Sequence, residues 1–364
     1  MSASTVASTP LARWAHGTRR SAYWLWKVAS HPANHGARLA AARRAVTWHW
    51  KTRGAAGEDV EAVVTVDGCT RIVARPHQFS AVWTLYDGVH EWEELQFCLR
   101  YLRPGDHFVD VGANVGVFSS MVGTRLPGVA ITAVEPFPPV RADLVANLAL
   151  NGLDVTVVEA AVSDSPGLAS FEVLDRDVLN RLAPADEPDT DARPESTNGA
   201  ITVPVTTLDA LVGADPPALV KIDVEGSELL VMRGARRLLA DEARPPVLLF
   251  EHAGHGSHFG ITPAEIRSAL AEQGYGIHLL DGHLTPWTSD EQPPTPNVIA
   301  CRDVAAVRAR LLAAGGAPVA PPVRVDVVYR SRTPTTTQTA PAVTTVPTQT
   351  ATTHAPFSAP EVPR

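Results

Sequence analysis

The sequence predicts an α/β fold built on a mostly parallel sheet with helices on both faces. Seven short apolar runs recur along the chain, at 107–111, 129–134, 155–162, 217–222, 246–250, 275–280 and 297–301. Helical patterns separate the earlier runs, at 116–126, 138–150, 226–240 and 263–273. Strands that alternate with helices indicate a parallel sheet. The last two runs have no helix between them, so we expect them to form an antiparallel pair.

Two further elements precede this core. Asp67 and Gly68 lie between two β-rich runs within residues 62–74, which predicts a tight hairpin. Apolar residues among acids in 91–102 follow a helical spacing. This segment is therefore expected to form a helix that leads into the first core strand.

Two segments lie outside this rhythm. Residues 184–200 are acidic and contain no large apolar group, so we expect a mobile surface loop. The residues after Arg332 are almost entirely Thr, Pro, Ala, Val and Gln. This composition cannot bury enough apolar area to offset the entropy of ordering, and we expect a disordered tail.

These observations divide the 364 residues into four parts. The parts are a basic aromatic N-terminal arm at 1–57, a β-hairpin accessory region at 58–90, the α/β domain at 91–330 and the tail at 331–364. The α/β part is long enough to bury one sizeable core.

Charge is unevenly distributed along the chain. Residues 1–57 contain nine Lys or Arg and no acid, whereas the net charge of the whole chain is −8. Aromatic residues interleave with these cations: Trp14, Tyr23, Trp24, Trp26, Trp48 and Trp50. Two interpretations stay open, an arm that packs its aromatics on the acidic core and an interfacial segment on anionic lipid. Nucleic acid is not expected as a partner, because no RNA-binding module is recognisable and the core is acidic.

Cysteine usage and targeting features favour a reducing compartment. Cys69, Cys98 and Cys301 are odd in number, far apart and without CxxC spacing, which argues against a disulfide framework and a zinc ribbon. No apolar run reaches the roughly eighteen residues that a membrane span needs. Lys27 interrupts the segment that superficially resembles a signal peptide. We therefore expect a cytoplasmic protein, with peripheral membrane contact through the arm as an open alternative.

The most informative motif follows the first core strand. Residues 110–116 read Asp-Val-Gly-Ala-Asn-Val-Gly and open a helical pattern. This predicts a strand, a glycine turn and a helix N-terminus, which together form a cradle for a nucleotide-type cofactor. Glu135 ends the next apolar run, and a carboxylate there can accept hydrogen bonds from both hydroxyls of a ribose.

The details of this motif favour S-adenosylmethionine. A dinucleotide fold prefers G-x-G-x-x-G, but Asn114 stands where the middle glycine is expected. Asp110 is a negative charge beside the turn that repels phosphate and suits an amino group or a sulfonium cation. Both features indicate a cofactor without phosphate groups.

The residues of these motifs resemble the FkbM family of S-adenosylmethionine-dependent methyltransferases. The resemblance extends from about Glu91 to Cys301, and its most specific string is Lys-Ile-Asp-Val-Glu-Gly-Ser-Glu at 221–228. It also includes the Glu135-Pro136 pair, Asn147, Asn151-Gly152, the Ala-Val-Ser string at 161–163 and the Thr-Leu-Asp string at 207–209. The resemblance implies a class I, Rossmann-like methyltransferase domain with a seven-stranded sheet that the antiparallel pair closes. It also implies methylation of sugar or polyketide hydroxyls.

The candidate cofactor residues lie at the carboxyl ends of the predicted strands, where open α/β sheets place their ligands. They are Asp110, Gly112, Ala113, Asn114, Gly116, Glu135, Val162 and Ser163. Ala161, Val162 and Ser163 end the third predicted strand and are expected to line an adenine pocket.

Asp223 and Glu225 are the first candidate catalytic residues, because they end the fourth strand beside the first. Two carboxylates in an apolar cleft repel each other, so one can hold a raised pKa and act as a base. Alternatively they share a divalent cation, although a metal is not expected here. A third interpretation is structural, in which Asp223 orients a loop or holds the methionine amino group and Glu225 caps the next helix.

His252 is the third candidate, since it follows the fifth strand in a run that also holds His255 and His258. A neutral imidazole is a natural base near neutral pH, whereas a loop histidine is often only solvated.

The sequence therefore predicts an S-adenosylmethionine-dependent O-methyltransferase that acts on a sugar, glycolipid or polyketide-type natural product. The alternatives are N-methylation and a cofactor-binding interaction module without turnover. The partner is expected to be a small-molecule or glycolipid acceptor, and the sequence does not indicate an oligomeric state.

Overall fold

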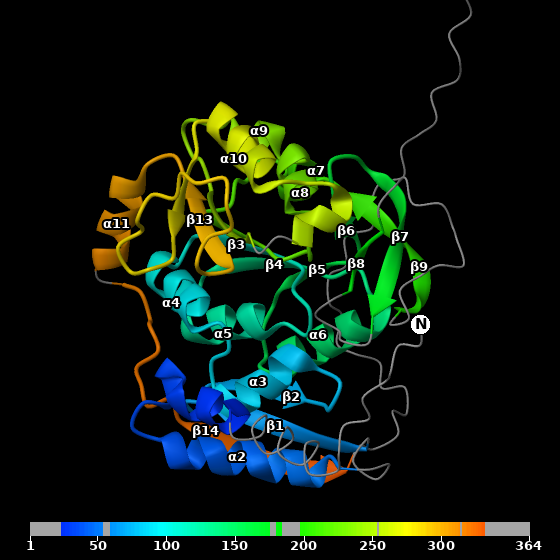
Figure 1. The fold of residues 1–364 in the computed structure, drawn as a ribbon, viewed down its shortest axis with the longest axis vertical. Helices are drawn as coiled ribbons and strands as arrows, with labels where there is room; N and C mark the ends of the chain where they lie inside the picture. Colours follow the sequence, from blue (N-terminus) through cyan, green and yellow to red (C-terminus); the bar gives the residue numbers. More distant parts are fainter. Residues whose placement is uncertain are drawn as a thin grey trace, which may run out of the picture.

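A seven-stranded sheet organises the part of the chain that the computed structural model describes, which is residues 23–53, 59–174, 180–183, 197–252, 255–313 and 315–331 (Figure 1). Its strand order is β12-β13-β11-β10-β3-β4-β5. The strands are β3 (His107–Val111), β4 (Ala130–Val134), β5 (Thr156–Val158), β10 (Leu219–Ile222), β11 (Val247–Glu251), β12 (Gly276–Leu279) and β13 (Asn297–Cys301). The β11–β13 and β12–β13 pairs are antiparallel and the other four pairs are parallel. The fold class that the sequence predicts is confirmed.

Helices cover both faces of this sheet, because alternate strand residues face opposite sides. Phe108 belongs to one buried core, and Val109 to the other. The first core packs against α4 (Trp92–Tyr101), α5 (Val117–Arg125), α6 (Pro138–Leu150) and α11 (Val304–Leu312). The second packs against α7 (Leu208–Val212), α8 (Glu228–Arg233), α9 (Arg236–Leu239) and α10 (Pro263–Glu272). Figure 1 shows these two sets on opposite sides of the sheet.

The helix expected at 226–240 is two short helices, α8 and α9. Gly234 lies between them, and a Cβ at this position would approach the carbonyl oxygen of Ser163 to 2.1 Å. At the break between α8 and α9, the backbone of Gly234 therefore lies directly against the backbone of Ser163.

A small second sheet corrects two expectations. It has the order β6-β9-β7-β8, with β6 (Ala161–Val162), β7 (Gly167–Leu174), β8 (Arg181–Leu182) and β9 (Thr197–Thr206). The run 155–162 is therefore not one strand, since its first part forms β5 and its end pairs with β9. Of the expected mobile loop at 184–200, residues 197–200 begin β9, and 184–196 lie outside the described residues.

A third sheet forms an accessory layer below α5 and α6 in Figure 1. It contains β1 (Val60–Val66), β2 (Thr70–Ala74) and β14 (Val325–Ser331), with η1 (Pro32–Asn34), α2 (Arg38–Lys51) and α3 (Phe79–Asp87) beside it. The predicted hairpin is confirmed, because Val66 lies opposite Thr70 and both Asp67 and Gly68 have positive φ.

The last described strand belongs to this accessory layer and not to the α/β domain. β14 pairs antiparallel with β1 along its whole length, from Val60 opposite Ser331 to Val66 opposite Val325. The structure thus groups 325–331 with the N-terminal hairpin, unlike the four-part division of the sequence. The expected disordered tail beyond Ser331 lies outside the described residues.

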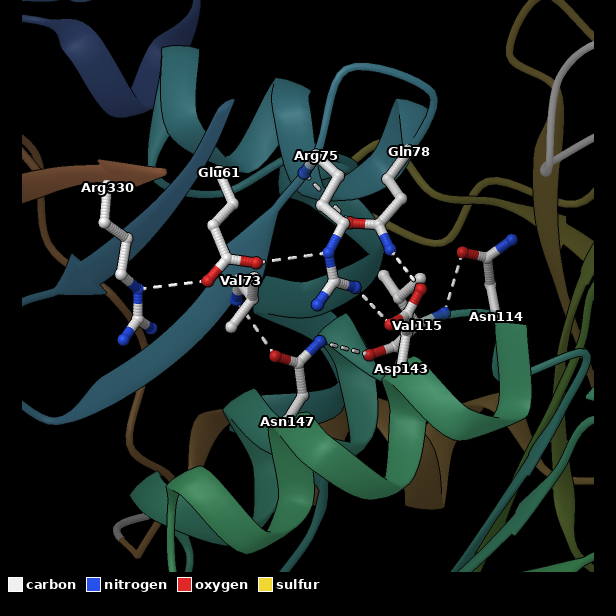
Figure 2. Close-up of polar contacts among 9 residues, drawn as sticks. All are labelled: Glu61, Val73, Arg75, Gln78, Asn114, Val115, Asp143, Asn147 and Arg330. Atoms are coloured by element: carbon white, nitrogen blue, oxygen red, sulfur yellow. Dashed lines mark hydrogen bonds and ion pairs between the residues drawn. The ribbon is translucent and has the colours of Figure 1, made fainter. Parts of the chain in front are cut away.

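Polar side chains connect the accessory layer to α6 (Figure 2). Arg75 is paired with Glu61 of β1 and with Asp143 of α6, and Arg330 of β14 bonds the other oxygen of Glu61. Asn147 joins the layers through the backbone, accepting from the Val73 N–H at 2.9 Å and donating to the Val115 carbonyl at 2.8 Å. The glycine turn is therefore braced from β2 through one α6 side chain.

The aromatic residues of the N-terminal arm divide between two environments. Trp48 is buried, and Trp24 packs edge-on against Tyr86 with ring centroids 5.2 Å apart. Tyr23, Trp26 and Trp50 are exposed, and Trp14 lies outside the described residues. Packing on the body of the protein thus accounts for only part of this aromatic set.

Two expectations about the whole chain are met within the described ranges. All three cysteines are free, as expected without a disulfide framework. None of the described helices is long and apolar enough to cross a bilayer.

Candidate functional site

A cavity of about 200 Å³ opens at the carboxyl ends of the central parallel strands. Eight of the residues selected from the sequence line it, namely Asp110, Gly112, Ala113, Asn114, Glu135, Val162, Asp223 and Glu225. Gly116, Ser163 and His252 are not among its lining residues. The glycine turn and the acidic loop after β10 therefore face the same space.

The glycine turn has an unusual backbone for reasons that lie within the protein. Gly112, Asn114 and Gly116 all have positive φ. A Cβ at Gly112 would lie 1.8 Å from the carbonyl oxygen of Asp223, and one at Gly116 would lie 2.4 Å from a methyl group of Leu144. Gly112 thus allows two loops to touch and Gly116 allows α5 to approach α6. These packing requirements exist in addition to any contact with a ligand.

Glu135 is fixed against the turn. Its side chain is buried, and its carboxylate accepts hydrogen bonds from the backbone N–H of Asn114 at 3.0 Å and of Phe137 at 2.9 Å. Each carboxylate oxygen can accept more than one hydrogen bond. The geometry therefore holds Glu135 in place and leaves it able to accept ribose hydroxyls.

Asp110 offers a buried carboxylate oxygen that can accept a hydrogen bond from a cationic cofactor. It is 1% exposed, and Ser119 donates to its Oδ2 at 2.7 Å. Its Oδ1 is buried without a hydrogen-bond partner among the described residues. Burial raises the pKa of Asp110, and nearby Lys221 opposes that shift. A buried acceptor of this kind suits an amino group or a sulfonium and disfavours phosphate.

One wall of the cavity is apolar and includes residues that sequence reasoning missed. Ala161 and Val162 of β6 line it together with Phe171 of β7 and Leu182 of β8. Phe171 also stacks on Phe137, with ring centroids 6.3 Å apart. The second sheet therefore supplies an apolar wall that fits an adenine ring.

Ser163 lies beyond this wall. Its backbone N–H donates to the carbonyl of Thr206, which continues the β6–β9 pairing. The correction follows from the early end of β5, because the 161–163 segment joins the second sheet and not the central one.

Three carboxylates gather in the wall of the same cavity. One oxygen from each of Asp223, Glu225 and Glu251 lies within 4.8 Å of the others. Lys221 Nζ lies 2.7 Å from Asp223 Oδ2 and 4.8 Å from the centre of the Phe118 ring. This carboxylate cluster of Asp223, Glu225 and Glu251 therefore has one buried cation beside it.

The cluster retains protons near neutral pH. Burial, together with the charge of Asp223, raises the pKa of Glu251 to about 8, and the same two causes raise the pKa of Glu225 well above its ordinary value. Burial alone lowers the pKa of Lys221, but Asp223, Glu91 and Asp110 outweigh it, so the pKa is raised. Lys221 therefore stays charged, and its ammonium group lies against the Asp223 carboxyl group. The oxygens can accept a proton or hold a divalent cation.

Glu228 plays a structural part in the same loop. It accepts from the backbone N–H of Val224 at 3.3 Å and of Gly226 at 3.1 Å. Glu225 itself has a φ of 56°, a conformation that non-glycine residues rarely adopt. The loop therefore directs Glu225 into the cavity while Glu228 holds the backbone.

Two residues of the accessory region and the first residue of the α/β domain also line the cavity, and no local sequence signal indicated them. Phe79 of α3, His90 and Glu91 all line the space. Trp83 stacks on the His90 ring at 5.5 Å with an interplanar angle of 16°, and Phe79 meets the same ring edge-on at 5.7 Å. Burial lowers the pKa of His90 to about 4, so the ring is neutral. The accessory region thus contributes an aromatic surface beside the carboxylate cluster.

His252 lies away from the chemistry that the sequence assigned to it. It is buried, and its backbone N–H donates to the carbonyl of Pro296 at 2.6 Å. Its ring lies 5.8 Å from that of Phe250. Glu251 lines the cavity, and adjacent residues of an extended chain point to opposite sides. His252 is therefore not placed to act as a base in this cavity.

Comparisons with known proteins identify the central part of the chain. Residues 110–277 match a family model described as the methyltransferase FkbM domain. The chain is 43% identical over 67 residues to 31-O-demethyl-FK506 methyltransferase FkbM of Streptomyces tacrolimicus, a match that covers 18% of this chain and 26% of that protein. It is 27% identical over 194 residues to hexuronic acid methyltransferase AglP of Haloferax volcanii, covering 52% of this chain and 72% of that protein.

A solved structure that resembles the chain is precorrin-6Y C5,15-methyltransferase of Geobacter metallireducens. The two chains are 15% identical, with a TM-score of 0.33, and the alignment covers 57% of this chain and 87% of the other.

Proposed function

We propose that this protein uses S-adenosylmethionine to methylate a hydroxyl group of a sugar, glycolipid or polyketide-type natural product. The premise is that residues 110–277 belong to the FkbM family of methyltransferases. One observation carries the proposal. A single cavity is lined both by the glycine turn with Glu135 and by the carboxylate cluster. Residues that would hold the cofactor and residues that could take up a proton therefore face the same space.

The cofactor residues divide the work of binding. Glu135 accepts hydrogen bonds from the ribose hydroxyls, and Asp110 accepts one from the methionine amino group. Val162 and Phe171 pack on the adenine. S-adenosylmethionine, when bound, supplies an electrophilic methyl group. The chain's own task is then to orient the acceptor and exclude water.

The carboxylate cluster takes the proton of the acceptor hydroxyl. Asp223 is the preferred base and takes up this proton, because the Lys221 ammonium lies 2.7 Å from its Oδ2, whereas the raised pKa values of Glu225 and Glu251 mean that they already carry protons near neutral pH. Positioned general bases contribute about a hundredfold or more to such reactions. A divalent cation bound by the same three oxygens would acidify the hydroxyl instead, and this remains the second mechanism to test.

The acceptor class is inferred from chemistry beside the carboxylate cluster. Phe79 and neutral His90 offer an apolar surface on which the hydrophobic face of a sugar or macrocycle ring can rest. The carboxylates offer acceptors for its hydroxyls. Two related methyltransferases, whose names give hexuronic acid and 31-O-demethyl-FK506 as the molecules that they methylate, support this class.

Calorimetry followed by turnover tests the proposal. The protein should bind S-adenosylhomocysteine, and it should release that product when it is given S-adenosylmethionine with uronic-acid glycosides or macrolide alcohols. A parallel set of amines tests N-methylation. Binding without turnover on any acceptor would favour the non-catalytic module, whereas no binding would contradict the assignment of the cavity. EDTA treatment followed by Mg²⁺ addition separates the two ways of removing the proton.

A further inference from the structure

The outer face of α2 carries larger apolar side chains than its inner face. Inward, the helix buries Ala41, Ala45 and Trp48. Outward, Leu39 is 69% exposed, Val46 51% and Trp50 71%. A helix whose only role is to cover a sheet normally has the reverse arrangement. This outer face therefore needs an explanation beyond the packing of the accessory layer.

The three exposed residues form one stripe. Leu39, Val46 and Trp50 are spaced by seven and four residues, about two turns and one turn of a helix, so they lie on the same line along its surface. Figure 1 places α2 at the outer edge of the molecule, on the far side of the accessory layer from the central sheet. We call these three residues the apolar stripe.

Two more exposed aromatics lie on the preceding helical segment, residues 23–30. Tyr23 is 64% exposed and Trp26 is 62% exposed, and their rings stack 5.8 Å apart. Trp24 of the same segment lies 6.2 Å from the ring of His49, so this segment runs beside α2. Aromatic side chains with one polar edge are the residues that membrane interfaces favour.

Basic residues border the apolar stripe. Arg38, Arg43, Lys51 and Arg53 are all exposed, and residues 1–57 contain no acid. Arg44, by contrast, turns inward and donates to the carbonyl oxygens of Leu85 and Tyr86. The exposed cations therefore have no acidic neighbour in the surrounding sequence, and the surface complements a layer of negative charge.

We propose that the apolar stripe and its basic border dock this protein on the surface of an anionic lipid membrane. The stripe would enter the region between headgroups and acyl chains, while Arg38, Arg43 and Lys51 contact lipid phosphates. The proposal is independent of the methyl-transfer reaction, since no residue of this surface lines the cavity. It would bring the enzyme to the place where a lipid-linked acceptor resides.

Vesicle sedimentation with the full chain tests this surface. The protein should bind vesicles of phosphatidylcholine with about one third phosphatidylglycerol and should not bind phosphatidylcholine alone. High salt, about 0.5 M NaCl, should weaken binding because exposed charges are screened. The triple variant Leu39→Ser, Val46→Ser, Trp50→Ser should reduce the partition coefficient at least about tenfold, and Arg38→Glu, Arg43→Glu, Lys51→Glu should do the same.

Matched controls use exposed residues elsewhere on the chain. Leu168 is 75% exposed and Leu312 is 87% exposed, so Leu168→Ser with Leu312→Ser removes similar apolar surface away from α2. Arg244→Glu does the same for an exposed cation. Both controls should bind like the parent, and unchanged melting temperatures would show that the α2 variants are folded.

Several results would overturn the proposal. These are absence of binding to anionic vesicles at low salt, equal binding to phosphatidylcholine alone, and equal loss in the Leu168 and Leu312 control. A concentration-dependent dimer that the serine variant abolishes, without vesicle binding, would identify a second copy as the occupant. Oligonucleotide binding that only the charge-reversal variant loses, again without vesicle binding, would identify nucleic acid instead.

Discussion

The turn after β3 and the loop after β10 follow neighbouring parallel strands and touch each other. Their polar groups differ, because those at the turn are hydrogen-bonded and those at the loop are carboxylates close to one another. At the turn, the Asn114 N–H donates to the Glu135 carboxylate, which follows β4, and the Asn114 side chain accepts from the Val115 N–H at 2.7 Å. At the loop, Asp223 and Glu225 converge with Glu251 of β11, and the pKa values of the two glutamates are raised. These polar groups of the turn are hydrogen-bonded, whereas the carboxylates of the cluster repel each other when they ionise.

This difference separates binding from chemistry. A satisfied turn is preorganised, so a cofactor meets a surface that does not need to rearrange. A loop of mutually repelling acids binds a proton more readily than isolated carboxylates do, which is what removal of a hydroxyl proton requires. Substitutions in the turn should therefore reduce stability and affinity, while substitutions in the loop should reduce turnover.

The largest effect is expected at the point where the two regions touch. Gly112→Ala places a Cβ against the Asp223 carbonyl in a residue with φ of 77°, and should lower the free energy of unfolding by more than about 3 kcal/mol. Gly68→Ala is the matched control, because its φ is 72° but no atom lies within 4 Å of the new Cβ. That variant should lose only about 1–2 kcal/mol. Urea unfolding measures both, and equal losses would mean that contact between the loops is unimportant.

Turnover is expected to fall next when the acidic loop is neutralised. Asp223→Asn should reduce kcat by about a hundredfold or more, because the acceptor proton loses its destination, and Glu225→Gln should have a smaller effect. Affinity for S-adenosylhomocysteine should change far less. His252→Ala provides the contrast, since His252 does not line the cavity and its removal should leave the rate within the same order of magnitude. A large loss at His252 with none at Asp223 or Glu225 would reverse the assignment.

Cofactor affinity should depend on Glu135. Glu135→Ala should weaken S-adenosylhomocysteine binding by about 1.5–3 kcal/mol, the range for charge-assisted hydrogen bonds. Calorimetry measures this loss. Glu159→Ala serves as the control, because Glu159 follows β5, is paired with Arg141 and does not line the cavity. Equal affinity in the two variants would place the ribose elsewhere.

The last expected effect is on the pH dependence of stability. The pKa of Glu251 is raised from 4.5 to about 8, so its contribution to stability is fully present below about pH 4.5 and is lost as the pH rises through about 8. Glu251→Gln cannot ionise and should make the decline in unfolding free energy from about pH 5 to pH 9 shallower. Chemical denaturation at each pH measures these unfolding free energies. The same pH dependence in parent and variant would contradict a raised pKa for Glu251.

Sequence patterns predicted those parts of the fold that residues near one another in the sequence determine. The central strands are short apolar runs with turn residues at their ends, and the hairpin has Asp67-Gly68 at its turn. The second sheet and β14 were not predicted, because β6 continues an apolar run that looks like one strand and β14 depends on pairing with β1 at the other end of the described chain. Periodicity does not encode such distant partners.

The same distinction applies to the site. The glycine turn and acidic loop follow strands whose carboxyl ends must meet, so their residues could be placed together in advance. Phe79 and His90 approach from the accessory region and Glu91 from its junction with the α/β domain, and nothing in their spacing indicates that approach. His252 was predicted from its chemistry and its place after the fifth strand, but Glu251 lines the cavity and the alternation of an extended chain directs the next side chain away from it.

The pairing of β14 with β1 has a consequence for synthesis of the chain. β1 emerges early from the ribosome, but its outer edge stays unpaired until residues 325–331 have been made. Throughout that interval Trp48 also lacks Tyr329, whose ring stacks on it at 6.3 Å. An open strand edge beside an exposed aromatic is a site for association with other chains. The accessory layer is therefore the last part of the molecule to close, and nascent or truncated chains that end before residue 325 should be the ones that chaperones retain.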